Sequence, residues 1–179
     1  MQEEESLVRR AQERDQEALA EIYERYFDKI YRYIFFRIGN IQEAEDMTQQ
    51  VFLKALEKIA SFKWKSIPLS AWLFRIAHNQ VVDYFRKKSK RATMPIEPYL
   101  AIVDDGDDPH LLLEEKFETE QLISAVRGLT EAQRAVISLR FSSELSVAEV
   151  AKVLGKNPGA VKALQHNAIV ALRKIMITA

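Results

Sequence analysis

The chain has 179 residues, of which 47% are hydrophobic, 29% are charged and none is cysteine. This apolar content can fill the core of one medium domain or of two small ones, and the lack of cysteine excludes disulfides and thiolate metal sites. The N-terminal sequence lacks the apolar core of a signal peptide, and no stretch approaches the roughly 18 apolar residues of a membrane span. We therefore expect a cytoplasmic protein without direct membrane insertion.

The formal net charge of zero hides blocks of opposite sign. Residues 1–60 sum to −4, residues 61–92 to +7, residues 93–115 to −7 and residues 116–179 to +4. Screening in physiological salt acts over about 8 Å, so a basic face acts on a partner independently of a distant acidic one. The neutral total is therefore compatible with a nucleic-acid partner.

Three helices are predicted in the first half of the chain. Apolar residues recur every three or four positions over residues 19–38, which indicates one long helix with a wide buried face, ended by Gly39. Asn40 and Glu43 then read as a helix cap and its partner, and they open a second helix. A third helix begins near Ser70 and continues into a cluster of cations.

The amino-acid composition changes at the start of the second half of the chain. Prolines, Gly106 and a string of aspartates between residues 92 and 109 are typical of a linker, because they form a core poorly. Later helix starts are marked by cap residues and their partners: Asp108 with Pro109, Thr130 with Gln133, Ser146 with Glu149, and Asn157 with Pro158. The fold class is therefore all-α, with two small helical domains at residues 1–92 and 112–179 joined by a flexible acidic linker at 93–111.

The break within residues 146–174 has the pattern of a helix-turn-helix. Such a motif needs a small residue where its helices cross, a turn residue that tolerates positive φ, and buried aliphatic residues on its second helix. Ala151, Gly155, Val161 and Leu164 lie at the matching positions. The outer face then offers donors to phosphates or base edges: Lys156, Asn157, Lys162, Gln165 and His166. An ordinary helical hairpin would share the apolar positions, so both interpretations stay open for this stretch alone.

Residues 62–91 interleave aromatic and basic side chains, as suits a separated DNA strand, because rings stack on unpaired bases while cations follow the backbone. The residues before the third helix form a candidate loop for holding an unstacked base: Phe62, Lys63, Trp64 and Lys65. Trp72, Ile76 and Phe85 have helical spacing and are expected in the core. For Trp64 both roles, base stacking and core packing, stay open. Asp83 is expected to pair with a nearby cation.

Two parts of the sequence together resemble the bacterial RNA polymerase sigma factors of the extracytoplasmic function (ECF) type. The first part, similar to region two of that family, comprises "AEDMTQQVFLKALEKI" at 44–59 and "WLFRIAHNQVVDYFRKK" at 72–88. The second, similar to region four, is "LTEAQRAVISLRFSSELSVAEVAKVLGKNPGAVKALQHNAIVALRKI" at 129–175. Their order, with an acidic linker between them, matches the compact two-domain architecture of this type.

This resemblance implies a transcription initiation factor whose partners are core RNA polymerase and promoter DNA, with no cofactor. The polymerase clamp would be bound by Asp46, Gln49 and Gln50. The minus-ten element would be contacted by Arg75, His78, Asn79, Arg86 and Lys87, and a base of the melted non-template strand would enter the loop at 62–68. The minus-thirty-five element would be read by Lys162, Gln165 and His166. An anti-sigma factor that masks both domains is a further implied partner.

The sequence also departs from the family pattern and leaves other interpretations to weigh. Leu164 and Asn167 stand where many relatives carry arginine, which predicts a different or looser upstream preference. The loop before the third helix is unlike the Gly- and Arg-rich version common in the family. An enzyme is disfavoured, because the histidines lie in separate segments without metal-ligand spacing and no phosphate-binding glycine loop occurs. A stand-alone helix-turn-helix regulator and a helical adaptor without a nucleic-acid role remain as alternatives.

Overall fold

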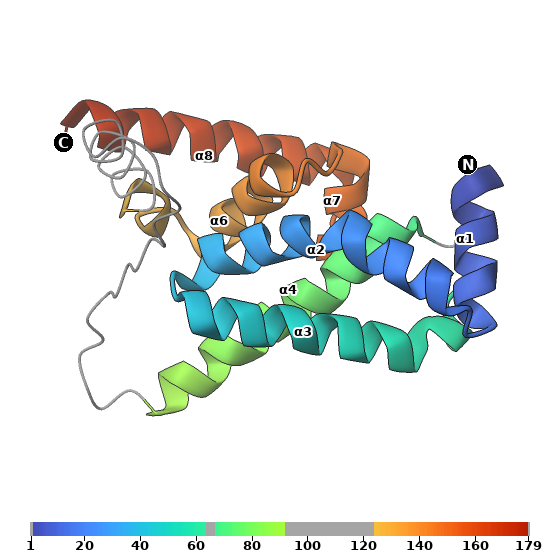
Figure 1. Ribbon diagram of the computed structural model, residues 1–179. Helices are drawn as coiled ribbons and strands as arrows, with labels where there is room; N and C mark the ends of the chain where they lie inside the picture. Colours follow the sequence, from blue (N-terminus) through green and yellow to red (C-terminus); the bar gives the residue numbers. More distant parts are fainter. Residues whose placement is uncertain (1, 64–66, 92–123, 179) are drawn as a thin grey trace, which may run out of the picture.

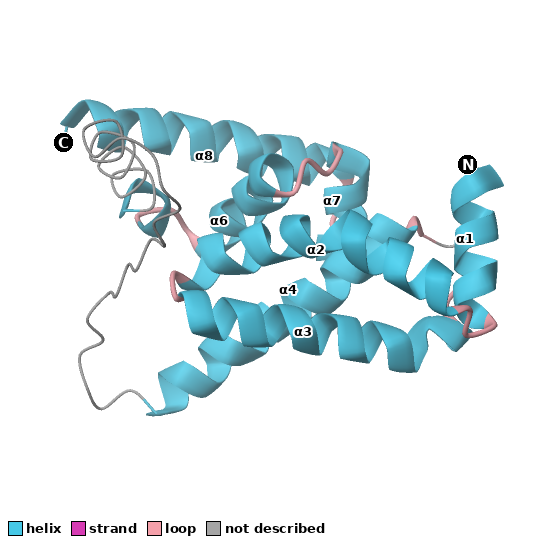
Figure 2. Cartoon of the chain, viewed as in Figure 1, coloured by secondary structure: helices cyan, strands magenta, loops and turns pink. Residues whose placement is uncertain are grey.

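The structure, a computed structural model, describes residues 2–63, 67–91 and 124–178. Within them every regular element is a helix, as predicted (Figure 2). The N-terminal helices are α1 (Gln2–Gln12), α2 (Gln16–Ile38), α3 (Ile41–Lys58) and α4 (Leu69–Arg91), with the 3-10 turn η1 (Ile59–Ser61) after α3. The C-terminal helices are α6 (Glu131–Ile137), α7 (Val147–Leu154) and α8 (Pro158–Thr178), with the π-helical turn η2 (Ser138–Ser142) before α7. The expected linker and the helix start at Asp108 lie outside the described residues.

The predicted boundary between α2 and α3 is confirmed. Gly39 ends α2 in a left-handed conformation, with φ at 71°, and its amide donates to the Phe35 carbonyl. Asn40 caps α3, because its side-chain oxygen accepts from the Glu43 amide at 3.0 Å. The reciprocal half of the predicted pair is not seen, since the Glu43 carboxylate accepts from the Tyr84 hydroxyl at 2.6 Å. Glu43 thereby ties the start of α3 to α4.

Caps also fix the C-terminal helices where the sequence predicts them. The boxes of Thr130 with Gln133 and of Ser146 with Glu149 are both complete, so each cap amide and each third-position amide has a partner. The Asn157 side chain accepts from the Ala160 amide at 2.8 Å and opens α8. These bonds satisfy amides that the first turn of a helix leaves unpaired.

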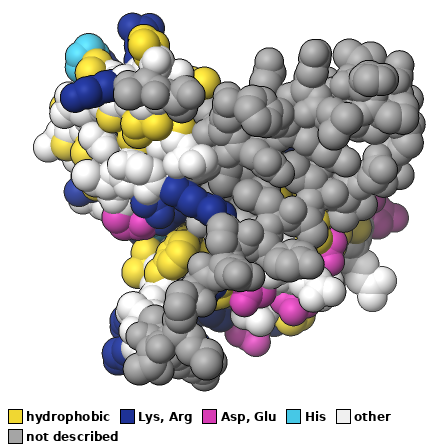
Figure 3. Space-filling view, turned by 90° about the vertical axis from the view of Figure 1, so that its left-hand side faces the viewer, with side chains coloured by type: hydrophobic (Ala, Val, Ile, Leu, Met, Phe, Trp, Pro, Cys, Tyr) yellow, Lys and Arg dark blue, Asp and Glu magenta, His cyan; other side chains and the backbone are white. Residues whose placement is uncertain are grey.

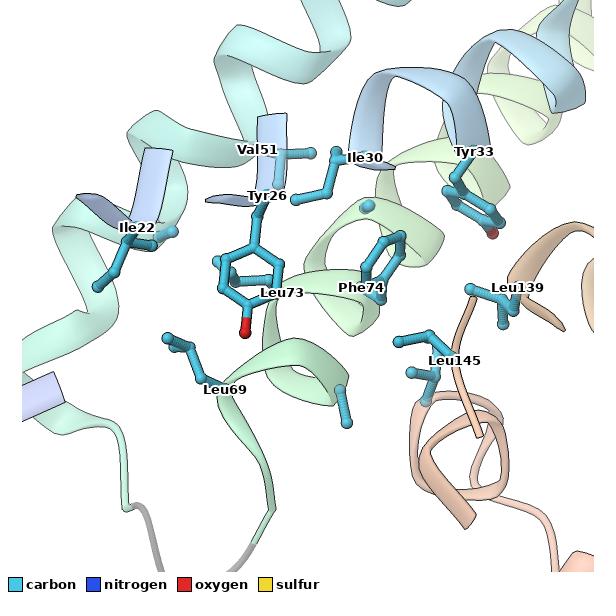
Figure 4. Close-up of a cluster of buried hydrophobic side chains, with 14 of the residues drawn as sticks. Ile22, Tyr26, Ile30, Tyr33, Val51, Leu69, Leu73, Phe74, Leu139 and Leu145 are labelled. Atoms are coloured by element: carbon cyan, nitrogen blue, oxygen red, sulfur yellow. The ribbon is translucent and has the colours of Figure 1, made fainter. Parts of the chain in front are cut away.

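One apolar cluster runs through both sets of helices. Ile30 and Tyr33 of α2 and Phe74 of α4 are fully buried in it. Leu139 of η2 and Leu145, just before α7, belong to the same cluster and point toward Phe74 (Figure 4). The main cluster therefore extends across the boundary between the two predicted domains.

The arrangement of the elements follows from this shared core. In the ribbon, α2 lies between α3 and the C-terminal helices, and α8 runs along the far edge of the molecule (Figure 1). The N-terminal and C-terminal helices meet where α4 packs against α7 and α2 packs against η2. A smaller cluster of Leu129, Ile137 and Ala168 holds α6 to α8. No helix of the described residues is long and apolar enough to cross a membrane.

Candidate nucleic-acid interface

A polar and basic stripe runs along the exposed side of α4. Arg75, Asn79 and Arg86 are exposed and lie four and seven positions apart, which places them on one helix face, with exposed Lys87 beside them. Arg86 pairs with Asp83 at 3.0 Å, which confirms the expected structural role of that carboxylate. Figure 3 looks onto the side of the molecule where α4 ends, and Lys and Arg side chains lie there in separate groups, one of them beside Asp and Glu side chains. We call Arg75, Asn79, Arg86 and Lys87 the α4 stripe.

His78, which the resemblance assigns to the same DNA contact, does not join the stripe. It is half-buried, and its Nδ1 lies 3.0 Å from the Tyr33 hydroxyl. Burial, helped by the nearby Arg37 guanidinium, lowers the pKa of His78 to about 4. The imidazole is therefore neutral at pH 7 and cannot neutralise a phosphate. His78 thus contacts α2 through Tyr33 and adds no positive charge to the α4 stripe, and its contact with the minus-ten element stays a prediction.

Phe62 also has a different place from the predicted one. Its side chain is only 7% exposed, and its ring centroid lies 4.8 Å from that of Trp72. Its carbonyl accepts from the Gln12 side chain at 2.7 Å, which fastens the loop to α1. The ring of Phe62 is therefore part of the core in this structure, and its role in base capture stays a prediction. Lys63 is exposed, while Trp64 and Lys65 lie outside the described residues.

The three residues of α4 that are expected in the core pack against it. Trp72, Ile76 and Phe85 are partly buried and pack against the main apolar cluster. Trp72 and Ile76 lie on one edge of the buried face of α4 and Phe85 lies on the other edge, because Ile76 and Phe85 are nine positions apart. The fully buried Leu73, Ala77 and Val81 lie between these edges and opposite the α4 stripe, so α4 is amphipathic.

The outer face of α3 carries the three predicted polymerase-binding residues. Asp46, Gln49 and Gln50 are all exposed, whereas Val51 and Ala55 on the opposite side are buried. Gln49 also lines an apolar groove of about 390 Å³ together with residues that the sequence analysis missed: Tyr23, Phe52, Leu53 and Leu56. Leu53 is 60% exposed at the edge of this groove. Leu53 and Leu56 lie outside the face of α3 that carries the buried Val51 and Ala55. Apolar residues at such positions are the feature of the sequence that could have indicated this groove.

The helix-turn-helix geometry is present in α7 and α8. Ala151 and Val161 are buried, and Gly155 takes a left-handed conformation with φ at 62°. Leu164 is partly buried against the main cluster, as expected for a residue facing the core. The predicted turn, crossing and inner face are therefore confirmed.

The outer face of α8 and the turn before it hold most of the predicted base and phosphate donors. Lys156, Asn157, Lys162 and His166 are exposed. Gln165 differs, because it is half-buried and its side-chain oxygen accepts from Arg140 Nε at 3.0 Å. The side chain of Gln165 is therefore held by a residue of η2, at the edge of the outer face of α8.

The described residues hold no group of three or more His, Cys, Asp or Glu side chains arranged for a metal ion. The three predicted surfaces are thus built from hydrogen-bond donors, cations and apolar side chains: the α4 stripe, the outer face of α3 and the outer face of α8. Such surfaces bind and orient macromolecules, and they occur on separate helices of one chain.

Comparison with known proteins identifies both halves of the chain. Residues 22–91 match the family described as Sigma-70 region 2, and residues 125–174 match Sigma-70, region 4. The chain is 33% identical over 175 residues to the ECF RNA polymerase sigma factor SigW of Bacillus subtilis, covering 93% of each. It is 38% identical over 170 residues to the ECF RNA polymerase sigma factor BldN of Streptomyces coelicolor, covering 95% of this chain but 64% of BldN. The chain thus spans less than two thirds of the length of BldN.

Solved structures share the fold. CnrH in complex with the cytosolic domain of CnrY superposes with a TM-score of 0.76 at 21% identity, covering 98% of this chain and 97% of CnrH. The sigma factor RpoE in complex with the anti-sigma factor NepR from Bartonella quintana gives 0.72 at 22% identity, covering 88% of this chain and 95% of RpoE. With both Sigma-70 regions present in order and a relative matched along almost its whole length, this chain belongs to the ECF sigma factors of RNA polymerase.

Proposed function

We propose that this chain is a promoter-specificity subunit, which binds core RNA polymerase and directs it to minus-thirty-five and minus-ten elements. The observation that carries the proposal is the presence, in one chain and in the order of the two Sigma-70 regions, of the α4 stripe and the α7–α8 helix-turn-helix. A duplex reader alone would need only the second of these surfaces. The first has the cations and the extended helix face that suit a separated strand.

Upstream, α8 enters the major groove of duplex DNA. Lys162 and His166 project from its outer face, and Lys156 precedes its N-terminus, where the helix dipole favours a phosphate. Asn157 contributes through the cap it forms, which fixes the first turn of α8. Lysine contacts to phosphates position the helix, whereas contacts to base edges select the sequence.

Downstream, the α4 stripe holds the melted non-template strand. Arg75, Arg86 and Lys87 follow its phosphates, and Asn79 lies between them with a side chain that both donates and accepts. Melting is driven by tighter binding of the open than of the closed DNA. The chain itself makes and breaks no covalent bond, so we propose no enzymatic role and no cofactor.

Polymerase binding is assigned to the outer face of α3. Asp46, Gln49 and Gln50 present polar groups beside the apolar groove that contains Leu53. A polar set next to an apolar groove suits a helical partner with both kinds of side chain, such as the clamp of the polymerase. This partner places the chain in the cytoplasm. RpoE was solved with an anti-sigma factor, and we propose a partner of that class for this chain too.

The test is transcription from a pool of randomised promoter fragments with sigma-free bacterial core polymerase, beside a mobility-shift assay with the chain alone. The proposal expects sequence-selective transcripts only when both proteins are present. Arg86→Glu and Lys162→Glu should abolish them, whereas Arg9→Glu on the exposed side of α1, a change of equal charge, should not. Tight duplex binding without core polymerase and without transcripts would favour a stand-alone regulator. Retained transcription in both variants would contradict the assigned DNA surfaces.

A further inference from the structure

An apolar side chain lies within the α4 stripe. Val82 follows Asn79 by three positions and precedes Arg86 by four, so the three residues share one face of the helix. Val82 is 42% exposed, whereas Ala77 and Val81 on the opposite side of α4 are fully buried. The face proposed to hold the melted strand therefore presents an aliphatic surface between an amide and a guanidinium.

Neither packing nor helix formation accounts for valine at position 82. Other exposed apolar residues line grooves, as Leu53 and Leu56 do on α3 and Phe141 does on η2. Valine is also a weaker helix former than alanine, lysine or glutamate, because its branched side chain loses rotamers against the preceding turn. Single exposed apolar residues are common on protein surfaces. It is therefore the setting of Val82 among the proposed DNA contacts, and not its exposure alone, that indicates a role.

The spacing along α4 is close to that of nucleotides in a strand. Each residue of an α-helix advances the axis by about 1.5 Å, so Val82 lies about 4.5 Å from Asn79 and about 6 Å from Arg86 along the helix. Stacked bases of one strand are about 3.4 Å apart. Arg86 is oriented by Asp83, 3.0 Å away, and 64% of its side chain remains exposed for a phosphate. A strand that runs along the stripe therefore brings Asn79 and Val82 to adjacent nucleotides.

The chemistry of Val82 selects one kind of base. Its side chain neither donates nor accepts a hydrogen bond, so a polar base atom pressed against it would lose water and gain no partner. Among the base edges, thymine presents an apolar group, the methyl at C5. A β-branched side chain in a helix holds mainly one χ1 rotamer, so both methyl groups of Val82 have fixed positions before any base arrives. Little conformational entropy is then lost on contact.

We propose that Val82 is a specificity-determining residue, whose methyl groups contact the C5-methyl group of a thymine in the non-template strand of the downstream element, next to the base that Asn79 contacts. This inference rests on the proposed function, because it requires α4 to hold that strand. Contacts of Arg86 and Lys87 with phosphates set the register of the strand but carry no sequence information. Val82 adds selection of a base to this surface.

The first experiment removes only the methyl group from the DNA. Deoxyuridine replaces each thymine of the downstream element in turn, in a promoter selected with core polymerase, and the apparent dissociation constant of the complex with polymerase and DNA is measured. One position in the non-template strand should weaken binding about fourfold, the value of one buried methyl group. Replacements in the template strand should have no effect. The sensitive position should be adjacent to the one whose base preference is relaxed by Asn79→Ala.

The second experiment removes the partner of that methyl group. Val82→Ala should weaken binding of the thymine promoter about fourfold and should abolish the further loss caused by deoxyuridine. Val82→Ile keeps the branched aliphatic side chain and should retain the loss. Val170→Ala makes the same change at a 51% exposed position of α8 and should also retain it. Alanine favours the helix, so Val82→Ala should fold, and circular dichroism checks this.

The outcomes separate this inference from the proposed function. Each variant is compared on two DNA molecules that differ by one methyl group, so a general loss of folded protein cancels from the ratio. A deoxyuridine penalty that persists in Val82→Ala, or the absence of any such penalty in the unmodified chain, would overturn the role of Val82 while leaving the promoter function intact. Equal weakening of both DNA molecules by Val82→Ala, with the penalty retained, would assign Val82 to a contact with polymerase instead. Failure of the unmodified chain to form any polymerase-dependent complex would contradict the proposed function, and this inference with it.

Discussion

Arg140 Nε donates to the side-chain oxygen of Gln165 at 3.0 Å, so a residue of η2 orients a side-chain amide of α8. A guanidinium has only donors, which means that the oxygen of Gln165 must face Arg140 and its NH₂ must face away. The exposed end of Gln165 is then a donor. It suits acceptors such as guanine O6 and N7, whereas the bidentate contact with adenine also needs the amide oxygen.

Arg140→Ala should therefore change the base preference at one position of the upstream element without lowering the overall affinity for DNA phosphates. The discrimination lost should be about 1–3 kcal/mol, the usual value of one good contact to a base edge. Selection from promoters randomised in this element, with core polymerase present, measures it. Gln165→Leu should relax the same position, and Arg173→Ala, further along α8, should relax none. A uniform loss at every position would argue that Arg140 acts on phosphates or on folding.

The stability of the chain should depend on the protonation of His78. Burial and Arg37 hold the pKa of His78 at about 4, while the nearby Glu131 opposes them, and the unfolded chain has the ordinary value near 6.5. Because the folded pKa is the lower one, this contribution is fully present above about pH 6.5 and is lost as the pH falls toward 4. The loss should reach about 3 kcal/mol. Urea unfolding between pH 7.5 and 4.5 measures it, and His78→Gln should remove this slope while other groups keep theirs.

Gly155 should contribute to the stability of the chain through its backbone conformation alone. Its φ is 62°, and a Cβ added there would meet no atom within 4 Å. Gly155→Ala should therefore cost about 1–2 kcal/mol of unfolding free energy from the left-handed backbone, without a clash. Gly155→Asn should cost less, since asparagine tolerates this region better. Chemical denaturation compares the two variants. Equal losses in both would indicate a role for Gly155 other than its backbone.

Phe62 distinguishes a core role from base capture. Phe62→Ala should cost about 3–5 kcal/mol of stability, as expected for a buried ring packed on Trp72. Phe62→Leu keeps most of the apolar volume and should retain both stability and promoter melting, since the ring is not needed for stacking on a base. Permanganate footprinting of the melted strand with core polymerase reports melting. Loss of melting in a stably folded Phe62→Leu variant would return Phe62 to the DNA surface.

Local features of this fold could be predicted because their causes are local. Gly39, Asn40 and Ser146 end or begin helices through their own backbone or side-chain bonds, and the structure has each where the sequence predicts it. The exposed side of α4 follows from its apolar period in the same way. Helical patterning thus located the candidate surfaces.

Other features depend on contacts between distant segments. The sequence predicts Phe62 as an exposed aromatic of a loop, but contacts with α1 and Trp72 bury it. It likewise predicts Gln165 as a surface residue, but a hydrogen bond from Arg140 holds its side chain. Arg37 falls within a run of apolar residues, but its burial depends on the acid of Glu131, 94 positions away in the chain. The packing of the two sets of helices could not be read from periodicity, because periodicity identifies a buried face and not its partner.

The shared apolar cluster has a consequence for how temperature acts on the chain. Separation of the two sets of helices would bring Phe74, Leu139 and Leu145 into contact with water, and exposure of apolar surface raises the heat capacity. The free energy of this packing should therefore curve with temperature, and its apolar part should weaken on cooling. The exposed pair of Lys29 and Glu144 responds to salt instead, so temperature and ionic strength should act on different parts of the same contact.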